Sequence, residues 1–75
     1  MNAQRRKMLG KVIDLMYEAQ TLLEDVRDEE QEAFDNMPEG LQASSRGEAM
    51  EDAISTMDDI ISNLEDAESE LEELR

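Results

Sequence analysis

Apolar residues recur at alternating steps of three and four along two long segments of the chain. In the first segment, one set of heptad positions holds Leu9, Met16 and Leu23, and a second set holds Val12, Ala19, Val26 and Ala33. In the second segment, the two sets are Met50, Met57, Leu64 and Leu71, and Ala53, Ile60, Ala67 and Leu74. This repeat is typical of amphipathic helices that pack against a helical partner. The pattern therefore predicts two long helices.

The periodicity stops in the middle of the chain, where the sequence holds its one proline and two of its three glycines. Pro38 lacks a backbone donor and disfavours a helical residue before it, so the first helix is expected to span about residues 3–36. Ser45 and Glu48 match the S-x-x-E capping box that begins a helix. The second helix is expected over about residues 46–75. The connection, about residues 37–45, has room for a short helical turn from Pro38 to Leu41.

Folding the chain back at this connection pairs residues whose numbers add up to 83. The predicted pairs include Leu9–Leu74, Met16–Ala67, Ala19–Leu64, Leu23–Ile60, Val26–Met57 and Ala33–Met50. Large residues face small ones in several of these layers, which lets an interface interdigitate without voids. The predicted fold class is all-α, a single antiparallel two-helix coiled-coil hairpin covering residues 1–75.

Apolar residues remain on both flanks of this predicted seam, which is the row of residues that each helix turns toward the other. One flank holds Ile13, Phe34, Ile54 and Ile61, and the other holds Met8, Leu15 and Leu22. Exposed apolar surface of this kind usually marks an interface. We therefore expect self-association through Ile13, Phe34, Ile54 and Ile61, with two hairpins forming a four-helix bundle as a homodimer. The alternative is that the flanks dock on another protein.

The composition excludes most catalytic chemistry. Cysteine and histidine are absent, which removes disulfides, thiolate and imidazole metal sites and every nucleophile–histidine pair. Acid clusters such as Asp58–Asp59 have the ligand type that binds divalent cations. Helical bundles that bind two metal ions, however, normally add histidines, and the connection lacks the spacing of an EF-hand loop. We expect no enzyme activity, no cofactor and no metal, and a solvated role for the acids. The apolar runs are too short to span a membrane.

Charge is the strongest remaining signal. The net charge is −14, and Arg5, Arg6, Lys7 and Lys11 concentrate +4 in residues 1–11, which leaves −18 for residues 12–75. Direct nucleic-acid binding is therefore disfavoured. Paired acids recur every seven residues in the second helix, and we expect them to bind a protein partner: Glu51, Asp52, Asp58, Asp59, Glu65 and Asp66. Such a ladder imitates nucleic-acid phosphates toward a basic groove; the alternative is that it only solubilises the coiled coil.

The two aromatic residues each have two interpretations. Phe34 is expected to pack over the reversal against Ile54 or Leu41, and the alternative is an anchor in the pocket of a partner. Tyr17 is expected beside the seam, either as an ordinary surface residue or as a contact residue.

The reversal "DEEQEAFDNMPEGLQ", residues 28–42, precedes a helix with Ala, Ile and Leu at heptad spacing. This part of the chain resembles short acidic helical-hairpin proteins of tailed phages and conjugative elements, a group without an assigned activity. The resemblance covers residues 26–67 and implies a mobile-element setting in the cytoplasm of a bacterial host. We expect a non-enzymatic protein-binding module that inhibits a host defence or nucleic-acid-handling protein. The alternative is a structural or adaptor protein acting through its helical bundle.

Overall fold

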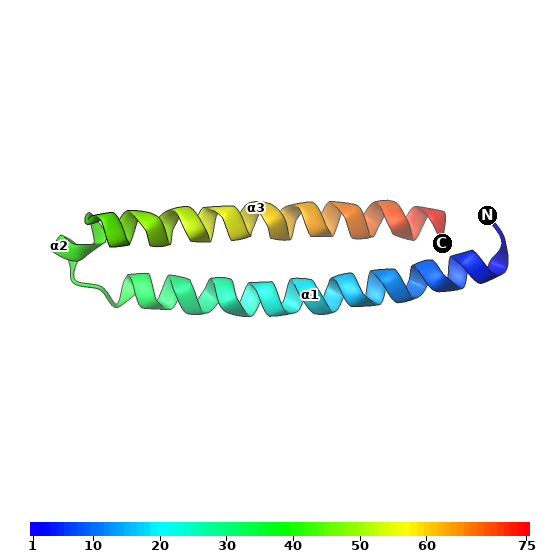
Figure 1. The fold of residues 1–75 in the computed structure, drawn as a ribbon, viewed down its shortest axis with the longest axis horizontal. Helices are drawn as coiled ribbons and strands as arrows, with labels where there is room; N and C mark the ends of the chain where they lie inside the picture. Colours follow the sequence, from blue (N-terminus) through cyan, green and yellow to red (C-terminus); the bar gives the residue numbers. More distant parts are fainter.

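A computed structural model of the protein describes all of residues 1–75. Three helices follow one another: α1 from Ala3 to Asp35, α2 from Glu39 to Gln42, and α3 from Ser45 to Leu74. The two long helices run in opposite directions side by side, with both chain termini at one end and α2 at the other (Figure 1). The molecule measures 58 × 15 × 12 Å. The predicted all-helical class is confirmed.

The ends of α1 follow local hydrogen-bonding rules. The side chain of Asn2 caps its start, because Asn2 Oδ1 accepts a hydrogen bond of 2.8 Å from the backbone N–H of Arg5. The helix ends at Asp35, one residue earlier than predicted, and Asn36 donates its backbone N–H to the Glu32 carbonyl. Pro38 follows in an extended conformation and cannot continue the helix.

The start of α3 corrects the predicted capping residue. Ser44, not Ser45, is the N-cap: its backbone is extended, and its Oγ accepts a hydrogen bond of 3.3 Å from the N–H of Gly47. The same hydroxyl donates to the Leu41 carbonyl. One hydroxyl therefore links α2 to α3, which explains why the helix begins one residue earlier than the sequence pattern indicated.

The reversal packs tightly around Gly47, which is buried. A Cβ on Gly47 would overlap the backbone carbonyl of Gln42. The Gln42 side chain in turn donates hydrogen bonds to the carbonyls of Phe34 at 3.1 Å and Met37 at 3.2 Å. Gln42 thus joins all three helices, and the missing side chain at Gly47 permits this close approach.

We therefore expect Gly47→Ala to destabilise the protein by about 1–3 kcal/mol, because the backbone of α2 has to move. Gly40 is the matched control, since nothing lies within 4 Å of the Cβ that an alanine would add there. Gly40→Ala should leave stability unchanged or raise it by about 0.4–1 kcal/mol through the unfolded chain. Thermal unfolding monitored by circular dichroism checks both. Equal melting temperatures for the two variants would contradict the tight reversal.

The observed seam differs from the predicted one. One set of positions belongs to both the predicted and the observed seam and is half-buried, as expected of inward-facing residues: Leu9, Met16, Leu23, Met50, Met57, Leu64 and Leu71. The second set, however, consists of Ile13, Gln20, Arg27 and Phe34 on α1 and Gly47, Ile54, Ile61 and Glu68 on α3. The predicted second set is largely exposed, with Val12 at 43%, Val26 at 53%, Ile60 at 43% and Leu74 at 53%.

The difference means that each helix is rotated about its own axis relative to the prediction, and this rotation has a physical reason. Four of the eight residues in the predicted second set are alanines, which bury little surface, whereas the observed set includes three isoleucines and Phe34. Each additional buried methylene contributes about 0.8 kcal/mol, so the larger side chains favour the observed seam. The aliphatic stem of Arg27 can also pack against apolar neighbours. The apolar stripe on each helix is wider than one seam, and the structure selects the bulkier half.

The pairing register also differs, by about one residue. Arg27 binds Asp58 across the helices, and Arg75 lies beside Gly10, so these cross-helix neighbours have numbers that add up to 85. Inward-facing positions such as Ile13 and Leu71, or Phe34 and Met50, add up to 84. The predicted layers, which add up to 83, are therefore not formed, and Ala19 faces solvent instead of Leu64.

The core enclosed by this seam is thin. Only Ile13, at 1% exposed, and Ile54, at 7%, are buried apolar residues. The solvent-accessible surface is 5557 Å², whereas a compact monomer of this mass would expose roughly 4,700 Å². None of the helices has a stretch long and apolar enough to cross a membrane.

Candidate functional site

The six acids proposed for partner binding all lie on α3 and are all exposed: Glu51, Asp52, Asp58, Asp59, Glu65 and Asp66. We call this set the acidic ladder. Glu51, Asp58 and Glu65 follow seam positions directly and therefore border the seam, while Asp52, Asp59 and Asp66 lie one residue further round the helix. Successive pairs are seven residues apart, which is about 10 Å along the axis.

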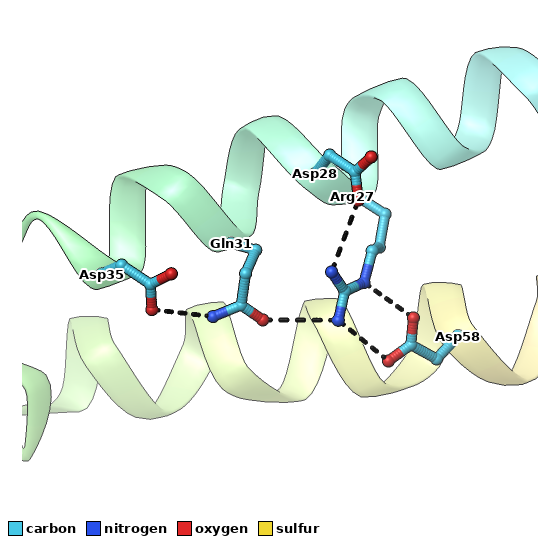
Figure 2. Close-up of polar contacts among 5 residues, drawn as sticks. All are labelled: Arg27, Asp28, Gln31, Asp35 and Asp58. Carbon is cyan, nitrogen blue, oxygen red and sulfur yellow. Dashed lines mark hydrogen bonds and ion pairs between the residues drawn. The ribbon is translucent and has the colours of Figure 1, made fainter.

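One member of the ladder is engaged within the chain. Arg27 reaches from α1 to Asp58 on α3, with Nε donating to Oδ1 at 2.8 Å and Nη2 to Oδ2 at 3.4 Å (Figure 2). Arg27 also contacts Asp28 and Gln31, each at 3.4 Å, and Gln31 donates onward to Asp35 at 2.9 Å. This two-point contact with a carboxylate joins the two helices at the surface.

The network has an electrostatic consequence. The hydrogen bond to Asp58 raises the pKa of the Arg27 guanidinium above its ordinary value. Arg27 is charged at neutral pH, as any arginine is, and it offsets the charge of one carboxylate of the ladder, that of Asp58. The remaining five acids of the ladder form no ion pair within the chain.

A second polar group lies inside the seam. Glu68 is only 3% exposed, and neither its Oε2 nor the buried Oε1 of Gln20 accepts a hydrogen bond from any group of the chain. The Gln20 amide donates instead to Glu24 at 3.0 Å. Burial raises the pKa of the Glu68 carboxyl above its ordinary value, and the carboxylates of Glu65 and Glu24 raise it further. The sequence pattern gave no sign of this group, because Glu68 was expected on the surface.

The residues proposed for self-association lie elsewhere than predicted. Ile13 and Ile54 are buried between α1 and α3, and Phe34 and Ile61 are partly buried there. Phe34 and Ile54 line one shallow hollow together with Arg27 and Asp58, which agrees with the predicted neighbourhood of Phe34 and Ile54. These four residues form the seam within one chain, so the prediction that they lie on an open flank is wrong for Ile13 and Ile54.

The open apolar surface is instead a row along α1, which we call the outer stripe: Met8, Val12, Leu15, Ala19, Leu22 and Val26. The exposed fraction reaches 64% for Leu15 and 66% for Leu22. The residues alternate at steps of four and three, the spacing of a helix-packing face. On α3, the exposed Ile60 and Leu74 lie on the flank of the seam opposite to that of the acidic ladder. The row is visible in the sequence, but the heptad pattern places half of its residues, Val12, Ala19 and Val26, in the predicted seam.

The start of α1 is basic, and it lies at the same end of the molecule as the acidic last turns of α3, which hold Glu70, Glu72 and Glu73. Arg6, Lys7, Lys11 and Arg75 surround a shallow hollow next to Gly10, together with Asp14. None of the four cations in residues 1–11 forms an ion pair within the chain. The start of α1 therefore carries a cluster of positive charge, while the adjoining end of α3 and the rest of the chain are acidic.

No three acidic side chains come close enough together to hold a metal ion. Tyr17 is 49% exposed and lines a shallow surface hollow with Glu18, Thr21 and Leu22. Comparison of the chain with protein families, with curated proteins and with solved structures finds no match in any of the three. The surface features that bear on function are the acidic ladder, the outer stripe and the basic start of α1.

Proposed function

We propose that the chain is a non-enzymatic protein-binding module of a phage or mobile element. In this proposal an antiparallel coiled-coil hairpin, acting in the cytoplasm of a bacterial host, inhibits a defence or nucleic-acid-handling protein. The observation that carries the proposal is the acidic ladder, in which five of six exposed carboxylates have no ion-pair partner within the chain.

The ladder suits a basic groove for electrostatic reasons. Its carboxylates lie on a rigid helix, so presenting them to a partner costs little conformational entropy. The charges repeat about every 10 Å, close to the screening length at physiological salt, so their fields overlap along the helix. A field of this kind raises the association rate with a positively charged protein and disfavours nucleic acid itself. The target would thus bind this protein where it otherwise binds phosphates.

A second copy of the chain is the other partner in this proposal. Only two apolar residues are buried in the single chain, and the surface exceeds that of a compact monomer by roughly 900 Å². A standard interface buries about 800 Å² on each partner, so one dimer contact removes an excess of this size. Two helix pairs would then form a four-helix bundle, with the acidic ladders on its outside.

The test begins with capture of a partner from bacterial lysate on the tagged protein, followed by binding kinetics at low and high salt. Replacing Asp52, Asp59 and Asp66 by asparagine should slow association about tenfold and flatten its salt dependence. The melting temperature should stay nearly constant, because these residues are exposed. The control removes the same charge from α1 with Asp14→Asn, Glu18→Gln and Glu32→Gln, and should slow association much less. Duplex DNA should compete with the wild-type protein.

The alternative function is a structural or adaptor protein, and it is favoured by one observation: Tyr17 and Leu22 line an apolar surface hollow. An adaptor would bind its partner through such side chains. Binding insensitive to salt but lost in Tyr17→Ala, at an exposed position, would replace the inhibitor proposal with the adaptor.

A further inference from the structure

The outer stripe of α1 is complementary to itself when a second copy is placed antiparallel to it. Residues that then face one another have numbers that add up to 34. The apolar layers are Met8–Val26, Val12–Leu22 and Leu15–Ala19, each formed twice around the two-fold axis. Every apolar position of the stripe between residues 8 and 26 meets another apolar position, and Leu15 meets the small Ala19. A self-complementary surface is what a two-fold symmetric dimer requires.

The charged residues obey the same symmetry. Extending the stripe by one step at each end reaches Arg5 and Glu29, whose numbers also add up to 34. Both are exposed, and neither forms an ion pair within its own chain. Along the outer edge of the stripe, residues whose numbers add up to 36 come side by side, which places Lys11 of one copy beside Asp25 of the other and the two copies of Glu18 beside each other at the two-fold axis. A parallel arrangement would place like charges together, Arg5 against Arg5 and Glu29 against Glu29, which is unfavourable.

The surface of α1 also has a hollow at the position where a side chain of the second copy would pack. An apolar hollow is lined by Arg5, Met8, Leu9 and Val12, together with Met1. The first four residues stand at positions i, i+3, i+4 and i+7, the arrangement that receives one side chain of a facing helix in knobs-into-holes packing. In the antiparallel register, the residue facing the centre of this hollow is Val26, which is 53% exposed in the single chain.

We propose that two copies of this chain associate through the outer stripes of α1, antiparallel, with Met8 facing Val26 and Arg5 pairing with Glu29 across the two-fold axis. The basic start of α1 in each copy then lies beside the acidic second half of α1 in the other, and the two reversals point in opposite directions. The inference rests on the self-association contained in the proposed function, and it adds the surface, the orientation and the register.

The chain has no cysteine, so single cysteines report on the contact without background. Met8 and Val26 are 18 positions apart, which is about 27 Å along α1, whereas a disulfide needs Cα atoms within about 7 Å. Met8→Cys and Val26→Cys should therefore not cross-link when each is oxidised alone. An equal mixture of the two should shift to a disulfide-linked dimer on non-reducing electrophoresis.

Charge reversal provides an independent readout. R5E and E29R should each weaken self-association roughly tenfold in sedimentation, because each variant places like charges at two symmetric contacts. Mixing R5E with E29R should restore the dimer, since both contacts then join opposite charges.

The outcomes separate the inference from the proposal on which it rests. Cross-linking of Met8→Cys with itself would show a dimer of parallel α1 helices and overturn the orientation while keeping self-association. No cross-link in any sample, with a monomer in sedimentation, would overturn both. Neither result bears on the salt-dependent binding of a basic partner, which is measured separately.

Discussion

Ile13→Ala should cost about 2–5 kcal/mol of folding free energy and abolish most of the helicity at room temperature. Ile13 is 1% exposed and is the most deeply buried side chain of the molecule. Its truncation leaves a cavity in a seam that contains only one other buried apolar residue, Ile54. Urea unfolding followed by circular dichroism measures this cost in free energy.

Val12→Ala is the matched control, because Val12 directly precedes Ile13 in α1 and belongs to the predicted seam. At 43% exposed it packs only lightly within one chain, so its truncation should cost less than about 1 kcal/mol of intramolecular stability. Its effect should also depend on protein concentration, since Val12 belongs to the outer stripe. If Val12→Ala were as costly as Ile13→Ala at every concentration, the predicted seam would be restored and the observed one rejected.

The second large effect is a stabilisation. Glu68→Leu should raise the melting temperature by several degrees, because it removes a buried carboxylate whose Oε2 has no hydrogen-bond donor. Glu70→Leu is the control at an exposed position two residues away and should change the melting temperature little. A melting temperature for Glu68→Leu at or below that of the wild type would show that the carboxylate is partnered in solution.

Glu68 also predicts the sign of a pH dependence. Its pKa is raised in the folded chain above the ordinary value of 4.5, so between these two pKa values the folded state binds more protons than the unfolded state. Stability from this group is therefore fully present below pH 4.5 and is lost as the pH rises through the folded pKa. The melting temperature should fall as pH rises through this window in the wild type, and fall less in Glu68→Gln.

The sequence was sufficient to predict the helical class and the place of the reversal. Those features depend on local rules: heptad spacing, the missing donor of Pro38, and a serine cap that was misplaced by one residue. It was not sufficient to choose the seam. α1 carries four adjacent heptad columns that contain apolar residues and α3 carries three, and periodicity alone does not say which two columns of each helix face the partner within the chain.

The candidate site was predictable to a similar extent. Exposure of the acidic ladder followed from its position on α3, but the pairing of Asp58 with Arg27 depends on the register, which was displaced by one residue. The burial of Glu68 and Gln20 could not be predicted from the sequence, because polar residues are expected outside a seam. They are buried because larger side chains at the same heptad positions turn inward. The outer stripe was hidden for the same reason, since Val12, Ala19 and Val26 fit either column.

The central claim is that this helix pair does not cover its own apolar surface and is completed by a second copy. Sedimentation equilibrium, with circular dichroism recorded on the same samples across a dilution series, tests it most directly. We expect a dimer at tens of micromolar, with mass and helicity falling together on dilution. A monomer that keeps full helicity over the whole series would contradict the claim.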